Sequence, residues 1–280
     1  MKSLWTVHFA IVLCLLQELR AQFIDPDCGT TIALPPTYRI IGGRNADIGS
    51  NPWIAYLHIN SALVCAGTLI TRRFVLTAAH CMDQYNLLTV RLGEYDTTTR
   101  IDCTSEFCIP TYEEYTVAAA HVHSLYENRQ DGRNDIGLLK LNGIVFYTKF
   151  IRPVCLFQNP GKVPNTSSYE ATGWGKIDLI NTATVLQTVN LNRLDQGECE
   201  QFLHTSLAHG QFCAGQSRAD TCSGDSGGPL LRKMSNGQVT RTVQLGIVSY
   251  GHHLCRGPGV YTDVLSFMRW ILHIIRWNSN

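Results

Sequence analysis

The sequence predicts an all-β protein, either a sandwich or a barrel, and two observations favour this class. From residue 40 onward, short segments rich in Val, Ile, Leu, Tyr and Thr recur between Gly and Asn turns, a spacing typical of these folds. In addition, 45% of the 280 residues are hydrophobic, which is enough to bury a substantial core. The predicted strands are Trp53–Ile59, Ala62–Ile70, Phe74–Thr77, Leu88–Leu92, Thr116–His123, Ile136–Leu141, Val185–Leu191 and Val243–Tyr250.

Two kinds of partner are disfavoured. The formal net charge of +1 gives the chain no general attraction for polyanions, so we expect no nucleic-acid partner. Near the C-terminus, apolar residues at 264, 267, 268, 271, 272 and 275 follow a helical period after Asp263, a suitable N-cap. This helix is too short to span a membrane and carries Arg269, His273 and Arg276, so we expect no membrane anchor.

The first 39 residues predict export and processing. Residues 1–21 begin with Lys2, continue through the apolar run Leu4–Leu16 and end near Ala21, the pattern of a secretory signal peptide whose cut position stays open. Residues 22–39 are polar, contain prolines and show no helical or alternating period, which predicts a propeptide. We therefore expect a secreted, extracellular protein with its folded domain at residues 40–280.

The cysteine count predicts disulfides. Cys14 lies in the signal peptide, which leaves ten of the 11 cysteines in the mature chain. An even number behind a signal peptide is typical of disulfides formed in an oxidising compartment. Zinc binding by Cys103 and Cys108 is the alternative, but their spacing and the lack of a second nearby pair disfavour it.

Three short segments carry residues for acyl transfer. A serine hydroxyl is a poor nucleophile, so this chemistry needs an imidazole to take its proton and a carboxylate to orient the imidazole. The candidates are Ser226, His80 and Asp135. The segments are Leu76-Thr77-Ala78-Ala79-His80-Cys81, Asn134-Asp135-Ile136-Gly137-Leu138-Leu139 and Gly224-Asp225-Ser226-Gly227-Gly228-Pro229.

The serine segment also fits a second pattern. Residues 224–228 also satisfy the nucleophile-elbow pattern of the α/β-hydrolases, in which the acid and then the histidine follow the serine along the chain. Only His252, His253 and His273 lie downstream of Ser226, and the flanking segments alternate strand with turn instead of strand with long helix. This context disfavours the elbow.

The order His, Asp, Ser and all three segments resemble the chymotrypsin and trypsin family, over about Ile40 to Asn280. The resemblance implies two packed six-stranded antiparallel barrels with the active site between them and the C-terminal helix on the second barrel. It makes Ser226 the nucleophile, His80 the general base and then acid, and Asp135 the orienting anion. The backbone N–H groups of Gly224 and Ser226 would bind the oxyanion.

The resemblance also implies a substrate preference. Asp220 stands six residues before Ser226, where trypsin-like enzymes hold a carboxylate at the base of the primary pocket. Such a carboxylate pairs with Arg or Lys of the substrate, and which of the two is preferred stays open. Ser249, Gly251 and Gly259 match the walls of this pocket.

Activation by cleavage is the third implication. A cut after Arg39 by an upstream trypsin-like protease would free the ammonium group of Ile40. In the family this group pairs with the carboxylate next to the nucleophile, which is Asp225 here. Because a buried Asp without a partner is costly, the pair would order the Gly224 loop only after cleavage.

Within the family, the chain most resembles the catalytic region of clip-domain proteases of arthropod extracellular cascades. The Cys103/Cys108 insertion, the Cys28 tether and the start at Ile40 carry this resemblance. The clip module itself is absent, because Cys28 is the only cysteine between the signal peptide and Ile40. The implied disulfides are Cys28–Cys155, Cys65–Cys81, Cys103–Cys108, Cys199–Cys213 and Cys222–Cys255.

The resemblance suggests protein substrates, with protease zymogens as one candidate class, and serpin-type inhibitors. A limited-proteolysis cascade, immune or developmental, is favoured over two alternatives, a digestive enzyme and a non-catalytic homologue that acts as a binding module.

Two further sites are expected on loops, although the chemistry itself requires no cofactor. Some relatives bind calcium in the loop that starts at Gly93, and here Glu94, Asp96 and Glu114 or Glu113 are candidate ligands. A solvated acidic loop is an equally good reading. The sequence Asn165-Thr166-Ser167 is an N-glycosylation acceptor. The histidine pairs 121/123 and 252/253 are poor metal candidates.

Overall fold

The structure is a computed structural model. It describes residues 23–32, 43–83, 85–127, 131–159, 161, 163, 166–177, 181–216, 221–235, 239–251 and 257–278. Several residues and segments singled out above lie outside these ranges, namely residues 1–21, Arg39, Ile40, Asn165, Asp220, His252, His253 and Cys255.

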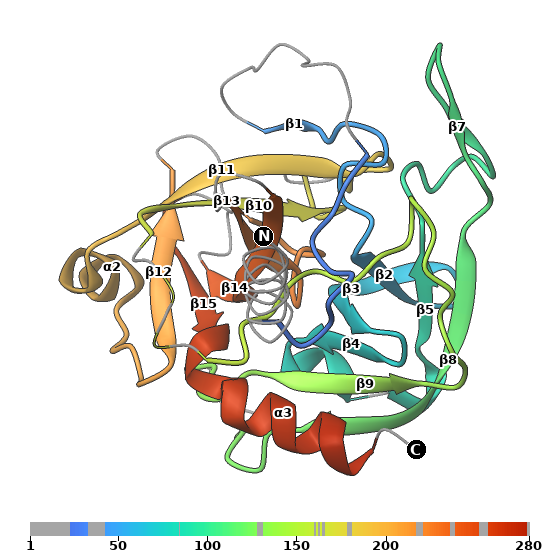
Figure 1. The fold of residues 1–280 in the computed structure, drawn as a ribbon. Coiled ribbons are helices and arrows are strands. Elements are labelled where there is room, and N and C mark those ends of the chain that lie inside the picture. Colours follow the sequence, from blue (N-terminus) through green and yellow to red (C-terminus); the bar gives the residue numbers. More distant parts are fainter. Residues whose placement is uncertain are drawn as a thin grey trace, which may run out of the picture.

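The first half of the chain forms a closed antiparallel barrel of six strands (Figure 1). Around the barrel these are β2 (Ile54–Ile59), β3 (Ala62–Thr71), β4 (Phe74–Thr77), β9 (Gly137–Leu141), β8 (Glu113–Val122) and β5 (Thr89–Leu92). Leu57, Leu69, Leu76, Val90 and Leu138 are fully buried in its core. Burial of such side chains is the main favourable contribution to folding.

The second half forms a sheet whose ends meet. Its order is β1 (Arg44–Asn45), β11 (Gln187–Arg193), β10 (Ser168–Gly173), β13 (Pro229–Ser235), β14 (Thr240–Gly251), β15 (Gly259–Asp263) and β12 (Gln211–Gly215). Because β11 also pairs with β12, six of these strands close a second barrel and β1 lies at its edge. The rings of Tyr169, Phe212 and Tyr261 pack in its core. The predicted all-β, two-barrel fold is confirmed.

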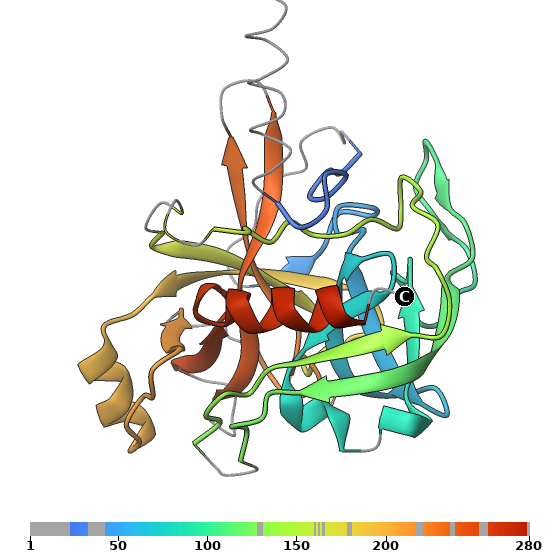
Figure 2. The same cartoon turned by 60° about the horizontal axis from the view of Figure 1, so that its bottom comes forward.

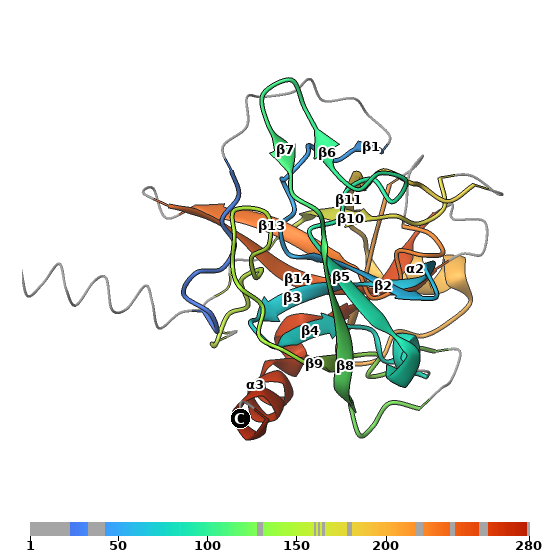
Figure 3. The same ribbon diagram turned by 90° about the vertical axis from the view of Figure 1, so that its right-hand side faces the viewer.

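Shorter elements connect the strands. They are the 3-10 turns η1 (Ala79–Met82) and η2 (Tyr85–Leu87), the two-stranded sheet β6 (Asp102–Cys103) and β7 (Cys108–Ile109), and the helix α2 (Gln196–Leu203). The carboxylate of Asp195 accepts hydrogen bonds from the N–H groups of Gly197 and Glu198 and so caps α2. The β6–β7 hairpin stands away from both barrels (Figures 1 and 3).

The C-terminal helix forms where the sequence predicts it, but it packs elsewhere. The carboxylate of Asp263 accepts the N–H of Leu265, and the chain passes through a 3-10 turn, η4 (Val264–Phe267), before α3 (Met268–Trp277). Met268 and Ile271 join a core cluster made mostly of first-barrel residues, which also includes Leu231 and Ile247 of the second barrel, and Figure 2 shows α3 running beside β9. The helix therefore packs mainly against the first barrel, and not on the second barrel alone as the sequence analysis expected. Among the described helices, none is long and apolar enough to cross a membrane.

Four of the implied disulfides are present: Cys28–Cys155, Cys65–Cys81, Cys103–Cys108 and Cys199–Cys213. Cys222 is also disulfide-bonded, and its implied partner Cys255 lies outside the described residues.

Residues 23–32 dock on the domain through more than their disulfide. The N–H of Gly29 donates to the carbonyl of Pro153 at 2.8 Å, and the N–H of Thr242 donates to the carbonyl of Gly29 at 2.9 Å. The Tyr147 hydroxyl donates to Asp25 at 2.6 Å. Gly29 has φ +67°, and a Cβ there would lie 2.6 Å from the carbonyl oxygen of Thr242, so only glycine fits this contact.

We predict that this segment stays attached when the chain is cut after Arg39, because Cys28 holds it to Cys155. Mass spectrometry of the cut protein under denaturing conditions should show the segment only after a reductant is added. Its release without reductant would contradict the tether.

Candidate active site

The side chains of His80 and Asp135 meet because the strands beside them pair. His80 follows β4 and Asp135 precedes β9, and these strands align Thr77 with Gly137. One carboxylate oxygen of Asp135 accepts the backbone N–H of His80 at 3.0 Å, and the other faces Nδ1 of its ring at 2.8 Å. The Asp135 side chain is 3% exposed and that of His80 is 32% exposed. The carboxylate is therefore shielded, whereas the imidazole is accessible.

The second barrel also holds Asp135. The hydroxyl of Ser249, on β14, donates to the same carboxylate oxygen as the histidine ring, at 2.6 Å. The hydroxyl of Thr262, on β15, donates to the backbone carbonyl of Asp135 at 2.9 Å. The sequence had suggested only a pocket-wall role for Ser249 and no role for Thr262.

These contacts shift both pKa values of the pair. Burial opposes ionisation of Asp135, but the hydrogen bond and charge of His80 and the Ser249 hydrogen bond outweigh it and lower the pKa of Asp135. Burial also opposes protonation of His80, but the hydrogen bond and charge of Asp135 outweigh it and raise the pKa of His80. The carboxylate is thus charged at neutral pH and strengthens the imidazole as a base.

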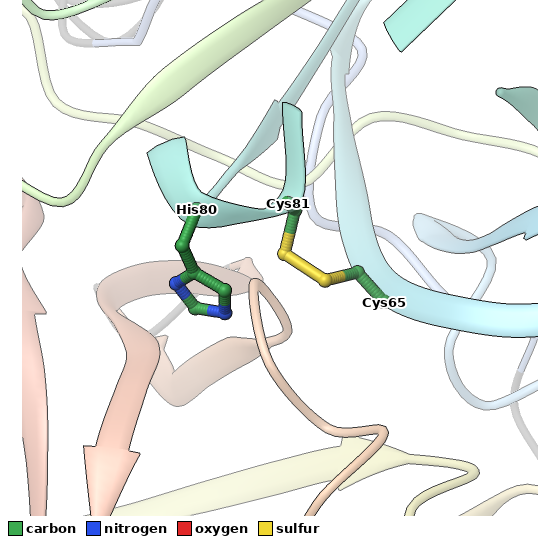
Figure 4. A group of neighbouring side chains, drawn as sticks. All are labelled: Cys65, His80 and Cys81. Carbon is green, nitrogen blue, oxygen red and sulfur yellow. A yellow bond between two sulfur atoms is a disulfide. The ribbon is translucent and has the colours of Figure 1, made fainter. Parts of the chain in front are cut away.

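Backbone contacts place the segment of Ser226 beside the segment that carries His80. Its carbonyl accepts the N–H of Ala66 on β3 at 2.8 Å. The preceding residue, Cys65, is bonded to Cys81 next to His80, and Figure 4 shows the imidazole beside this disulfide. The ring nitrogen and the two sulfurs lie within 4.8 Å of one another, but the sulfurs are joined and so are not thiolate ligands for a metal ion.

Gly227 fixes the loop that carries the serine. A Cβ on Gly227 would lie 2.0 Å from the Thr77 hydroxyl and 2.5 Å from the Ala66 carbonyl, so the loop packs tightly on the strand that leads to His80. The N–H of Gly227 donates to the carbonyl of Val248, the neighbour of Ser249, at 2.9 Å. The loop therefore lies between the segments that carry the base and the hydroxyl that binds Asp135.

Two backbone N–H groups and the serine hydroxyl form no hydrogen bond with the described residues. Gly224 has φ +100°, a conformation that L side chains rarely adopt, and a Cβ there would lie 3.0 Å from Cα of Gly175. Across the described ranges, neither the N–H of Gly224, nor the N–H of Ser226, nor the Ser226 hydroxyl forms a hydrogen bond. These groups are available to a bound molecule, as an oxyanion site requires.

The carboxylate of Asp225 is enclosed by backbone. Its oxygens accept the N–H groups of Gly175 at 2.8 Å and Cys222 at 2.9 Å. A Cβ on Gly173 or Gly175 would lie within 2.2 or 2.4 Å of these oxygens, so the carboxylate is tightly covered although the residue as a whole keeps some exposure. Burial raises the pKa of Asp225 to about 6 against these two hydrogen bonds. No cation pairs with it in the described parts of the chain.

The expected pocket walls lie together. Gly251 and Gly259 pair across β14 and β15, and a Cβ on Gly251 would lie 3.4 Å from Cα of Gly259. The hydroxyls of Thr221 and Tyr261 are hydrogen-bonded at 3.0 Å. Thr221 follows Asp220, which lies outside the described residues.

The candidate calcium ligands do not form one site. Glu94 accepts Nη1 of Arg91 at 2.8 Å, and Glu114 accepts Nε of the same guanidinium at 2.9 Å. Asp96 instead accepts the N–H and hydroxyl of Thr98, two residues on. Among the His, Cys, Asp and Glu side chains of the described residues, only Cys65, His80 and Cys81 gather three potential ligand atoms. As placed, Glu94 and Glu114 share the Arg91 guanidinium as their cation.

We predict that Asp135→Asn lowers the pKa of His80, because the substitution removes the charge that favours the imidazolium. An NMR titration of the His80 ring in a Ser226→Ala background measures it. Asp83→Asn is the matched control: Asp83 contributes the weakest of the interactions that raise this pKa, so its loss should have the smaller effect. Equal shifts in the two variants would contradict the assignment.

We also predict that Arg91→Gln destabilises the protein by about 3–5 kcal/mol, because it leaves the carboxylate of Glu94, 1% exposed, with the backbone N–H of Tyr95 but without a cation. Denaturant unfolding measures the loss. Arg44→Gln, which breaks the more exposed pair with Asp47, should cost only about 0–1 kcal/mol.

Calcium should leave the melting temperature of the EDTA-treated wild-type protein unchanged if Arg91 is the cation for both carboxylates. Ligand binding to the folded state would raise it. A calcium-dependent rise would restore the calcium site and contradict this arrangement.

Comparisons with known proteins agree with this geometry. Residues 40–271 match the trypsin family. The chain is 36% identical over 253 residues to phenoloxidase-activating enzyme 1 of Spodoptera litura, covering 85% of this chain and 67% of that protein. It is 35% identical over 306 residues to the Spaetzle-processing enzyme of Drosophila melanogaster, covering 93% and 76%.

A solved structure shares the fold. The crystal structure of the Drosophila Grass clip serine protease of the Toll pathway aligns with a TM-score of 0.79 and 30% identity, covering 95% of this chain and 78% of that one. With two closed barrels, a His-Asp pair between them and a serine loop against both, the chain belongs to the trypsin family of serine proteases and is related to the arthropod clip-domain proteases.

Proposed function

We propose that this chain is the zymogen of a secreted endopeptidase that hydrolyses peptide bonds after Arg or Lys. The observation that carries the proposal is the Asp135 carboxylate, which binds the His80 ring from one barrel and the Ser249 hydroxyl from the other. This arrangement holds the imidazole with Nδ1 toward the carboxylate and Nε2 directed away from it.

The residues then act in two half-reactions. His80 Nε2 takes the proton of the Ser226 hydroxyl as its oxygen attacks the scissile carbonyl, and the N–H groups of Gly224 and Ser226 bind the oxyanion. The imidazolium, stabilised by Asp135, gives its proton to the leaving amine, which departs as the acyl-enzyme forms. Water then adds to the acyl carbonyl with the same imidazole as base, and the imidazolium returns this proton to the Ser226 oxygen as the acyl–oxygen bond breaks and the acid product leaves.

Asp220 supplies the proposed specificity. It stands next to Thr221, whose hydroxyl is bonded to Tyr261, and Tyr261 lies on the strand that carries Gly259. Glycines at the facing positions 251 and 259 leave room for a long side chain. A carboxylate at the end of such a slot would pair with the guanidinium of Arg or the ammonium of Lys.

Activation would follow the cut after Arg39, once residues 1–21 have been removed as a signal peptide. The Ile40 ammonium would pair with the Asp225 carboxylate, whose pKa is raised by burial and which has two N–H donors but no cation among the described residues. Residues 22–39 would remain as a light chain on Cys155.

The names of the relatives favour a cascade role. Phenoloxidase-activating enzyme 1 and the Spaetzle-processing enzyme are named for action on one protein each, which supports limited proteolysis over digestion. The partners would be protein substrates such as protease zymogens, an activating protease and serpin-type inhibitors. Asn165 would carry an N-linked glycan. A non-catalytic binding role is the alternative, which the presence of His80, Asp135 and Ser226 disfavours.

We predict that the protein cut after Arg39 hydrolyses chromogenic peptides with Arg or Lys before the scissile bond. Ser226→Ala should abolish turnover, because no nucleophile remains, while the variant is still secreted. Asp220→Ser should selectively reduce turnover of the Arg and Lys peptides. Near wild-type turnover by Ser226→Ala would rule out the mechanism, and an unchanged preference in Asp220→Ser would rule out the pocket.

A further inference from the structure

The sequence contains two Arg-Ile bonds. One is Arg39–Ile40, the activation cut proposed above, and the other is Arg100–Ile101 in the loop between β5 and β6. We propose that Arg100–Ile101 is a second cleavage site for a trypsin-like endopeptidase, and that a cut there separates His80 from Asp135 and Ser226. The argument rests in part on the proposed preference for Arg, but the site itself is identified by its exposure.

The bond lies on the surface, in a turn that is closed by a hydrogen bond from the Thr99 hydroxyl to Asp102. Arg100 is exposed, and the side chain of Ile101 is 57% exposed. Within the described part of the chain, neither residue has a hydrogen bond or ion pair, whereas the turn before them is tied by hydrogen bonds to Asp96. Cleavage needs a segment that can extend into another enzyme's cleft, and exposed loop residues without backbone hydrogen bonds do so most easily.

Most other described Arg and Lys bonds are protected by regular structure. A strand or a helix must unfold before its backbone can enter a protease cleft. The basic residues in strands or in α3 are Arg44, Arg91, Lys140, Arg193, Arg232, Lys233, Arg241, Arg269 and Arg276.

Those in loops are held in other ways. Arg133 pairs with Asp131 at 2.9 Å. Lys176 and Ile177 donate backbone hydrogen bonds to Ser223 and Asn181. Arg73 and Lys149 each precede a buried phenylalanine. The guanidinium groups of Arg72 and Arg152 each donate a hydrogen bond to a backbone carbonyl. Of the described bonds, Arg100–Ile101 is therefore the most accessible one after a basic residue.

The cut would divide the catalytic residues between two pieces. Hydrolysis adds one water and leaves a carboxylate on Arg100 and an ammonium group on Ile101. Residues 40–100 carry His80, and residues 101–280 carry Asp135 and Ser226. The only cysteines of the first piece, Cys65 and Cys81, are bonded to each other, so no disulfide joins the pieces.

Non-covalent contacts alone, chiefly strand pairing and the shared apolar core, would then hold the first barrel together. The ladders of β5 with β8 and β4 with β9 run between the two pieces. Without the chain connection, closing the barrel becomes an association of two chains and loses the advantage of a short covalent loop. A cut at Arg100 would therefore limit the lifetime of the active protease.

The site is tested on the full-length Ser226→Ala protein, which cannot cut itself, with trypsin added at a limiting amount. N-terminal sequencing should find both Ile40 and Ile101. On denaturing gels without reductant, cuts at both bonds should release residues 40–100, whereas either cut alone should release nothing until the Cys28–Cys155 disulfide is reduced. Arg100→Gln should remove only the Ile101 product, and the matched control Arg133→Gln should keep both.

Complete formation of Ile40 without any Ile101 would overturn the site. Because the added trypsin performs the cut, this result does not depend on the chain's own activity. In a second arm, the activated wild-type protein should lose activity several-fold faster than activated Arg100→Gln. Equal lifetimes would overturn the role of the cut in limiting activity, even where Ile101 forms.

Discussion

The carboxylate of Asp135 is the interaction on which the site depends. It accepts hydrogen bonds from the backbone and ring of His80 on one barrel and from Ser249 on the other. A buried carboxylate is costly unless its lone pairs are satisfied, so these donors fix its position closely. The same group therefore sets the orientation of the imidazole and the placement of β14 against the first barrel.

The serine loop holds a second buried carboxylate, Asp225, which is less fully compensated than Asp135. Gly227 packs on Thr77 and Ala66 without room for a side chain, which places Ser226 between the two barrels. Next to it, the Asp225 carboxylate is enclosed by glycines and receives two N–H donors but no cation in the described structure. The geometry for catalysis thus comes with an uncompensated buried charge, which a new ammonium group would compensate.

The motifs predicted the catalytic residues because the chemistry needs those residue types, and their order along the chain, which resembles that of the trypsin family, predicted the fold. The strand periods predicted the first barrel better than the second: β10, β12, β13 and β15 were not singled out, because short segments such as Gln211–Gly215 carry too few alternating apolar residues. Ser249 was assigned to the pocket, and its bond to Asp135 follows only from the packing of the two barrels.

The loop carboxylates illustrate why local sequence is insufficient. The resemblance to relatives that bind calcium in this loop made them candidate ligands, whereas Arg91 and Glu114 are direct partners across β5 and β8, which brings the guanidinium to both glutamates. Register between strands distant in sequence decides this pairing. The placement of α3 on the first barrel likewise depends on contacts with residues more than 100 positions earlier in the chain.

The central claim is that Ser226 is a nucleophile activated by His80 and held ready by cleavage after Arg39. The most direct measurement is labelling by a fluorophosphonate probe, followed by mass spectrometry of the peptide that contains Ser226. The account predicts rapid labelling of Ser226 in the cut protein, much slower labelling in the uncut chain, and loss of labelling in cut His80→Ala. An unlabelled Ser226 in fully cut protein, or equal labelling in the His80 variant, would contradict it.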